Sequence, residues 1–186
     1  MRLFIALQIS DDVREAIAAL IREWKPLDGS WKWSRSENLH VTLKFLGEIP
    51  ENKLVRVAEA LRAVPTDLPI TLTFTGLGFF PHEGRPRVLW AGIEAPRSFP
   101  ALAASIDEAL ASVGVLPEEK PFTPHLTLAR SKAGKISPKL REAVAKYSAR
   151  EFGVMGASAF HLVESKLKST GAEYTTLQSF PGASES

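Results

Sequence analysis

Two short segments of the chain share a pattern that can do chemistry, a histidine followed two residues later by a threonine. The first segment, H-V-T-L, contains His40 and Thr42, and the second, H-L-T-L, contains His125 and Thr127. In a β-strand, side chains two residues apart project from the same face. Each segment is therefore expected to present an imidazole and a hydroxyl on one face and two aliphatic side chains on the other.

Two imidazoles on opposite sides of one phosphorus atom suit an in-line displacement, which needs a base on the attacking side and an acid on the leaving side. A histidine gives or takes a proton near neutral pH, and each such role accelerates a reaction by roughly 10²- to 10⁴-fold. A threonine hydroxyl can donate a hydrogen bond to a phosphoryl oxygen. The residue types therefore indicate metal-free chemistry at a phosphate.

Two plainer interpretations compete with this one. A single His-x-Thr segment in a strand is most often structural, but two copies in matching positions disfavour coincidence. A zinc site would need several ligands at suitable spacing. His82, in a Pro/Gly loop, and His161, in a late strand, lie near no second histidine at such a spacing in the sequence. We interpret both as structural.

The two motifs belong to a longer internal repeat. His125 follows His40 by 85 residues, and Arg87 follows Arg2 by the same interval (125 − 40 = 87 − 2 = 85). The segments that begin at these arginines read R-L-F-I-A-L and R-V-L-W-A-G. A repeat of this length predicts two duplicated α/β lobes rather than a solenoid. We expect a single domain over residues 1–186, made of two pseudo-symmetric lobes whose motifs face each other across a central cleft.

Hydrophobic periodicity predicts the elements that position the motifs. A buried strand is expected at residues 2–9, and Ser10 is expected to cap a helix that ends before Pro26. Further strands are expected at residues 39–46, 70–80, 87–94, 122–130, 154–167 and 173–180, and further helices at 51–63, 99–113 and 138–147. The polar tail after Phe180 is expected to be frayed.

The composition narrows the class of protein. A formal charge of +2, from 23 Lys+Arg and 21 Asp+Glu, argues against a dense basic face and a strong non-specific grip on nucleic acid. The chain has no cysteine, which excludes disulfides, thiolate catalysis and cysteine-based zinc sites. No apolar run approaches the roughly 18 residues of a membrane span, and the opening segment does not read as a signal peptide. We expect a cytoplasmic monomer.

With these residues in place, the chain resembles a known group of enzymes. The segments HVTLKFLGE, PFTPHLTLAR, RLFIAL and RPRVLWAG are similar to those of the 2H phosphoesterase superfamily, and within it to the RNA 2′,3′-cyclic phosphodiesterases, also called 2′-5′ RNA ligases. The resemblance extends from Arg2 to Phe180. It implies an α+β fold, bilobal, with largely antiparallel sheets around a water-filled cleft.

The same resemblance implies an activity. Members open 2′,3′-cyclic phosphate ends of RNA to 2′-phosphate ends without a metal or cofactor, and some join half-tRNA ends through a 2′-5′ linkage. His125 would be the proton acceptor that activates water, and His40 the proton donor to the departing 3′ oxygen. Thr42 and Thr127 would bind the phosphate oxygens, on which negative charge grows in the transition state. The assignment of acid and base rests on the family alone, because the two motifs are nearly symmetric in sequence.

Three further residues are candidates for substrate binding. Arg130 lies five residues after His125, and Phe45 five residues after His40. In an ideal strand this offset points away from the motif face, so Arg130 reaches the cleft only if the strand bulges or ends, and otherwise closes the strand end as an ion pair. Phe45 is expected in the core rather than against a base. Trp33, in the segment WKWSRSEN, either stacks on RNA bases or anchors its loop.

Three functions remain open at this point. The first is the cyclic phosphodiesterase acting on RNA ends, tRNA-like fragments included. The second is a small-nucleotide enzyme acting on ADP-ribose cyclic phosphate or 2′-5′ oligonucleotides. The third is a non-catalytic module that binds RNA ends, which loss of either histidine would favour and the presence of both disfavours. Tyr174, in a late strand, is interpreted as a packing residue.

Overall fold

The computed structural model describes residues 1–181, and within them nine strands form two sheets. The strands are β1 (Arg2–Gln8), β2 (Trp31–Trp33), β3 (His40–Glu48), β4 (Ile70–Phe80), β5 (Val88–Glu94), β6 (His125–Ser131), β7 (Glu151–Ala157), β8 (Phe160–Lys168) and β9 (Gly171–Phe180). The helices are α1 (Asp11–Trp24), α2 (Leu54–Arg62), α3 (Ser98–Ala111) and α4 (Pro138–Lys146), with short 3-10 turns at Lys25–Leu27, Ser36–Asn38 and Glu51–Lys53. Residues 182–186, on which the expectation of a frayed tail falls, lie outside the described part.

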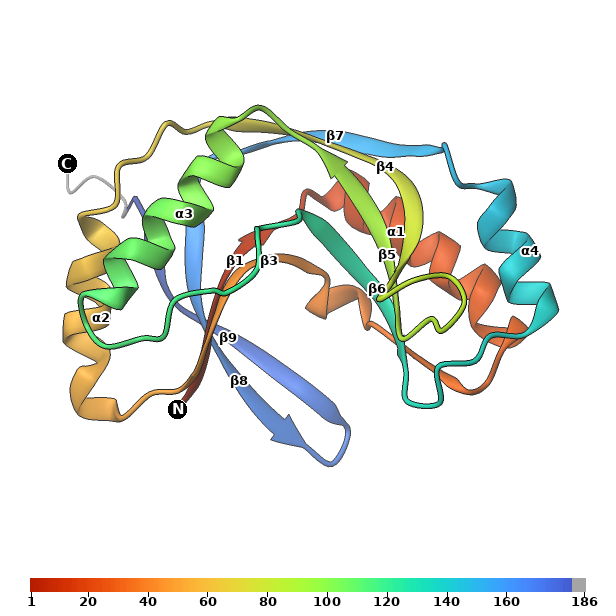
Figure 1. The fold of residues 1–186 in the computed structure, drawn as a ribbon, viewed down its shortest axis with the longest axis horizontal. Helices are drawn as coiled ribbons and strands as arrows, with labels where there is room; N and C mark the ends of the chain where they lie inside the picture. Colours follow the sequence, from red (N-terminus) through yellow and green to blue (C-terminus); the bar gives the residue numbers. More distant parts are fainter. Residues whose placement is uncertain (182–186) are drawn as a thin grey trace.

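The two sheets form two lobes. Sheet A has the strand order β3-β1-β8-β9 and sheet B the order β2-β6-β5-β4-β7, and the strand pairs are antiparallel. Helices α2 and α3 lie together at the end formed by sheet A, and α1 and α4 at the end formed by sheet B (Figure 1). The prediction of an α+β bilobal fold with largely antiparallel sheets is confirmed.

Helix α1 shows how the sequence sets the local structure. Ser10 caps it as predicted, because its Oγ accepts a hydrogen bond from the backbone N–H of Val13. The apolar face that the spacing predicts is buried, with Ile17 fully enclosed and Trp24 1% exposed. This face packs against β7, so α1 covers the outer side of sheet B.

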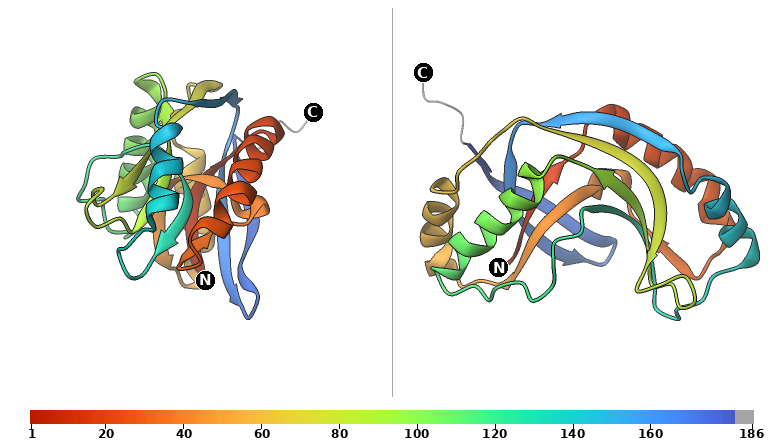
Figure 2. Two further views of the ribbon diagram at one scale, coloured as in Figure 1. Left: turned by 90° about the vertical axis from the view of Figure 1, so that its right-hand side faces the viewer. Right: turned by 45° about the horizontal axis from the view of Figure 1, so that its top comes forward.

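The lobes do not correspond one to one with the two copies of the repeat. Strands β1 and β3 of the first copy share sheet A with β8 and β9 of the second. Strand β4, which completes the first copy, arches across to pair with β5 and β7 in sheet B (Figure 2). Each sheet is therefore assembled from both halves of the chain.

The ladders also correct the alignment of the repeat. Phe4 pairs with Phe45 and Val88 with Arg130. Strands β3 and β6 thus match at an interval of 85 (130 − 45), whereas β1 and β5 match at 84 (88 − 4). Because the second copy has one residue more between these strands, the expected correspondence of Arg2 with Arg87 is wrong by one position.

Two elements differ from the sequence prediction. Strand β2 was not predicted, since three residues are too short to show a period. The expected strand at residues 154–167 is two strands, β7 and β8, because the chain leaves sheet B after Ala157 and joins sheet A at Phe160. The described residues contain no helix both long and apolar enough to cross a membrane.

Candidate active site

A cleft of about 640 Å³ is lined by residues of both sheets, within the usual range for a ligand site. His40 and Thr42 from β3 and His125 and Thr127 from β6 all line it, so the structure brings the two predicted motifs together. Among the described residues that line the cleft, four carry a positive charge and none carries a carboxylate. The four are Arg2, Lys32, Arg35 and Arg130. The cleft is therefore positive although the whole chain is almost neutral, and it suits an anionic ligand.

The ring of His40 is held through both nitrogens. Nδ1 lies 2.6 Å from the backbone carbonyl of Asn38, which can only accept, so Nδ1 carries the proton. Nε2 then accepts a hydrogen bond from the hydroxyl of Thr42 at 2.9 Å. The ring also packs against Phe4 and Tyr174, with centroid distances of 4.9 and 5.2 Å. These contacts fix the tautomer and orientation of His40.

The surroundings of His40 lower its pKa below the ordinary value. Burial is the largest cause, and the positive charge of Arg130 lowers the pKa further, while the hydrogen bond to the Asn38 carbonyl acts in the opposite direction. Arg130 lines the same cleft as His40. At neutral pH the free protein therefore holds His40 in its neutral form.

His125 is anchored in the same way as His40 but has different neighbours. Its Nδ1 lies 2.8 Å from the backbone carbonyl of Thr123, so Nδ1 is again the protonated nitrogen and Nε2 carries a lone pair. Phe80, at the end of β4, meets the ring edge-on at a centroid distance of 5.0 Å. The two histidines thus share an anchor at Nδ1 but differ in their ring neighbours, and Nε2 of His40 also accepts from Thr42, a difference that the sequence alone does not show.

A bulge in each motif strand decides where the next side chains point. In β3, Thr42 pairs with Ala6 and Lys44 pairs with Ile5, so that Leu43 is an extra residue in the ladder. Such an extra residue reverses the alternation of the strand beyond it. Leu43 and Lys44 are accordingly both buried, although they are neighbours in the sequence.

Beyond the bulges, Phe45 and Arg130 face the cleft. Phe45 is 58% exposed and lines the cleft, so the expectation that it lies in the core is wrong. In β6, the pairing of Leu89 and Trp90 skips Leu128 in the same way, and Arg130 again lines the cleft. Of the two alternatives for Arg130, the structure therefore shows the first, in which a bulge brings its side chain to the cleft.

The tryptophans of β2 are anchors. Trp33 lines the cleft but is 8% exposed, and Trp31 is 4% exposed. Nε1 of Trp31 donates to the backbone carbonyl of Lys135 at 3.1 Å. Trp33 thus forms part of the cleft wall, with too little free surface to stack broadly on a base.

The β8–β9 hairpin, which projects from the body in Figure 1, borders the cleft on one side. The backbone carbonyl of Ala172 accepts hydrogen bonds from Nη2 of Arg35 at 2.7 Å and from Nδ2 of Asn38 at 2.9 Å. The carbonyl of Asn38 in turn orients His40, and Tyr174 of the same hairpin packs edge-on against His40. Sequence reasoning missed the role of Asn38, since nothing in its neighbourhood distinguishes it from an ordinary loop residue.

The other two histidines do not line the cleft. Nδ1 of His82 accepts from the backbone N–H of Gly84 at 3.1 Å, and Nδ1 of His161 lies 2.8 Å from the hydroxyl of Ser179. Burial lowers the pKa of His161. Among residues 1–181, no three or more His, Cys, Asp or Glu side chains are grouped to hold a metal ion.

Two sheets around a cleft that holds a pair of His-x-Thr motifs define a class of phosphoesterase-like proteins, and comparison with known families agrees. Residues 13–166 match the family model described as the 2′-5′ RNA ligase superfamily. The chain belongs to this superfamily.

Similar proteins carry a more specific name. A protein of Archaeoglobus fulgidus named RNA 2′,3′-cyclic phosphodiesterase is 39% identical over 180 residues, which cover 97% of this chain and 99% of that protein. Among solved structures, TT0787 of Thermus thermophilus has a TM-score of 0.81 and 32% identity, with 97% of each chain covered. LigT of E. coli, solved in complex with 3′-AMP, has a TM-score of 0.77 and 28% identity, with 96% of each chain covered.

Proposed function

We propose that this protein is an RNA 2′,3′-cyclic phosphodiesterase that opens cyclic ends to 2′-phosphate ends without a metal ion. The observation that carries the proposal is the pairing of His40 and His125 in one cationic cleft, each anchored through Nδ1 to a backbone carbonyl. Because Nδ1 of each ring is engaged, proton transfer falls to Nε2, which in His40 also accepts from the Thr42 hydroxyl in the free protein. The names of relatives such as the Archaeoglobus protein support the substrate.

In the proposed reaction, water attacks phosphorus in line with the bond to the 3′ oxygen. Nε2 of His125 takes a proton from the water as the new P–O bond forms. The bond between phosphorus and the 3′ oxygen breaks, and Nε2–H of His40 gives its proton to that oxygen. The products are a 2′-phosphate and a 3′-hydroxyl.

His40 must be protonated to act as the acid, although its pKa is lowered in the free protein. The cyclic phosphate supplies the remedy, because it carries a negative charge into the cleft. That charge offsets the repulsion between Arg130 and the imidazolium, and attracts the imidazolium directly. Substrate binding thus raises the pKa of His40 and prepares it as a proton donor.

The neighbouring side chains complete the proposed site. Thr42 and Thr127 donate hydrogen bonds to the non-bridging phosphate oxygens, and Arg130 pairs with their charge. The exposed ring of Phe45 offers a face to the terminal base. Trp33 contributes a wall rather than a stacking platform.

Product analysis on a short RNA with a 2′,3′-cyclic phosphate end tests the proposal. With EDTA present, the wild type is expected to yield a 2′-phosphate, and His40→Ala and His125→Ala are expected to lose about 10³-fold or more in rate. Circular dichroism of both variants controls for folding. An intact cyclic end with the wild type, or loss of its activity in EDTA, would refute the metal-free mechanism.

Two finer properties belong to the same proposal. Joining of RNA ends through a 2′-5′ linkage would be the same opening with a ribose 5′-hydroxyl in place of water: its oxygen attacks phosphorus, its proton passes to His125, and the 3′ oxygen leaves with the proton of His40. Half-tRNA fragments are the matching substrates. One copy of the chain supplies every residue named above, so a monomer carries a complete site. Sedimentation of the active protein at assay concentration measures whether it remains a monomer.

A further inference from the structure

A second groove borders the cleft at Phe45. It has a volume of about 410 Å³ and lies between the segment from the end of β3 to the start of α2 and residues 113–118. Phe45 and Gly47 line both the groove and the cleft. The groove and the cleft therefore meet at Phe45, whose side chain is exposed.

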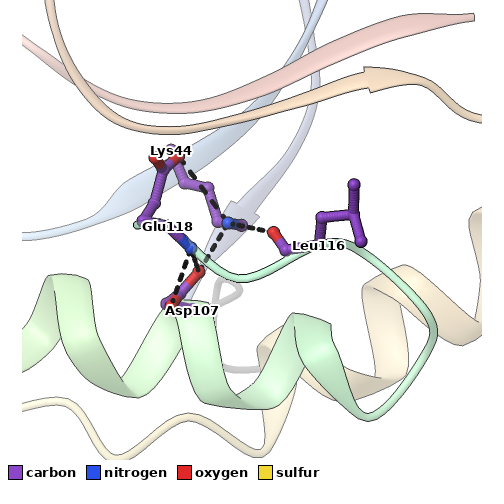
Figure 3. Close-up of polar contacts among 4 residues, drawn as sticks. All are labelled: Lys44, Asp107, Leu116 and Glu118. Carbon is purple, nitrogen blue, oxygen red and sulfur yellow. Dashed lines mark hydrogen bonds and ion pairs between the residues drawn. The ribbon is translucent and has the colours of Figure 1, made fainter. Parts of the chain in front are cut away.

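The far wall of the groove is an apolar side chain on a fixed backbone. Leu116 lines the groove and is 84% exposed. Its carbonyl accepts a hydrogen bond from Nζ of Lys44 at 2.9 Å, and the Lys44 ammonium also pairs with Asp107 and Glu118 (Figure 3). The side chain of Lys44 is 1% exposed, so it holds the backbone of this wall from the buried side. The side chain of Leu116 remains exposed to a ligand.

One exposed lysine at the groove offers a positive charge to a phosphate at its edge. Two carboxylates line it, but Glu118 lies 3.7 Å from Nζ of Lys44 and Glu48 lies 3.5 Å from the N-terminal ammonium. Glu48 is thus beside a cation, whereas Glu118 shares the Lys44 ammonium with Asp107. Lys53, exposed in the turn before α2, adds a positive charge to the same lining.

We propose that this groove binds the base of the penultimate nucleotide, so that the protein prefers oligonucleotide ends to mononucleotides. The inference rests on the proposed function and extends it. The terminal base stacks on the cleft side of Phe45, the penultimate base enters between Phe45 and Leu116, and Lys53 approaches the phosphate that links the two nucleotides. Stacking on such a platform tolerates every base, because every base has a π face.

The test compares a nucleoside 2′,3′-cyclic phosphate with a dinucleotide that has the same 3′ nucleoside and the same cyclic end. The dinucleotide is expected to have a higher kcat/KM by about 5- to 100-fold, the effect of one stacked base. Leu116→Ser is expected to reduce this ratio by about fivefold or more. Leu167→Ser is the matched control, since Leu167 is 78% exposed but lies outside the groove, and it is expected to leave the ratio unchanged.

A dinucleotide whose 5′ nucleotide lacks its base is the second arm and is expected to be used no better than the mononucleotide. Equal kcat/KM for the mononucleotide and the intact dinucleotide overturns the groove proposal but leaves the proposed function standing. A dinucleotide advantage that survives both Leu116→Ser and removal of the base also overturns it. If neither substrate is hydrolysed, the proposed function itself fails.

Discussion

The buried ion pair beneath the groove allows a prediction whose magnitude follows from unequal exposure. The side chain of Lys44 is 1% exposed and that of Asp107 is 24% exposed. Removing the carboxylate charge with Asp107→Asn leaves a buried ammonium without its main counter-ion, with Glu118 at 3.7 Å as partial compensation. Removing the ammonium with Lys44→Met leaves a carboxylate that water can reach and that still accepts from the backbone N–H of Glu118 at 3.1 Å.

The two variants should therefore differ in stability. An unpaired buried charge costs roughly 3–5 kcal/mol, and the remaining partners reduce this to about 2–3 kcal/mol for Asp107→Asn. For Lys44→Met, the lost charged hydrogen bonds are offset by the removed desolvation penalty, which leaves about 1 kcal/mol. In the double variant no buried ammonium remains, so its loss of stability should be close to that of Lys44→Met alone.

Urea denaturation followed by tryptophan fluorescence at pH 7 measures these differences, provided that the m-value stays constant. Equal losses for the two single variants, or a larger loss for Lys44→Met, would show that exposure does not control the cost. Additive losses in the double variant would show that the two charges act independently.

Three further predictions concern the cleft and the fold. Arg130→Gln is expected to raise the pKa of His40 in the free protein, because a repulsive charge is removed while burial remains; imidazole NMR titration measures this, with His161 as an internal reference whose pKa should not move. Phe45→Ala is expected to raise KM for RNA ends about 5- to 100-fold with little loss of stability, since the ring is 58% exposed; Phe45→Tyr keeps a ring and should keep the KM, and a wild-type KM in Phe45→Ala would contradict the stacking role. We propose that the chain is a single domain, because each sheet needs strands from both halves of the chain. Fragments 1–85 and 86–186 should therefore lack near-UV circular dichroism when made separately. A cooperative unfolding transition in either fragment alone would contradict this.

The sequence predicted the meeting of the two motifs because their residues obey simple alternation. His40 and Thr42 share one face of β3, while Val41 and Leu43 are buried on the other. The same spacing holds in β6. A two-residue period needs no knowledge of the neighbouring strands, so this part of the site could be read from the sequence.

The positions of Phe45 and Arg130 could not be read in the same way. Their direction depends on an extra residue in each ladder, and a bulge is a property of how a strand pairs with its neighbour. Counting along an ideal strand therefore placed Phe45 on the wrong face. The sequence also left open whether Trp33 stacks on RNA bases or anchors its loop, because its burial follows from the pairing of β2 with β6.

The assembly of the two sheets could not be predicted from the sequence either. The expected strand at residues 154–167 has an apolar pattern that suits either sheet, and its hydrophobicity does not say where the chain crosses over. The exchange of β4 and β8 between lobes is set by long-range pairing, such as that of Arg2 with Ser165. Local periodicity carries no record of such contacts.

Phe45 and Arg130 occupy equivalent places in two copies of one strand, and their difference has a consequence for how the proposed substrate would be oriented. A twofold dimer of identical half-length chains would present the same side chain on both sides of its axis. Joining the copies in a single chain removes that constraint and allows an aromatic ring on one side and a guanidinium on the other. An RNA end is itself polar, with a nucleoside on one side of the phosphorus and solvent on the other. In the proposed reaction, the unequal pair would let the cleft accept an RNA end in one orientation, so that each histidine would meet the same oxygen in every turnover.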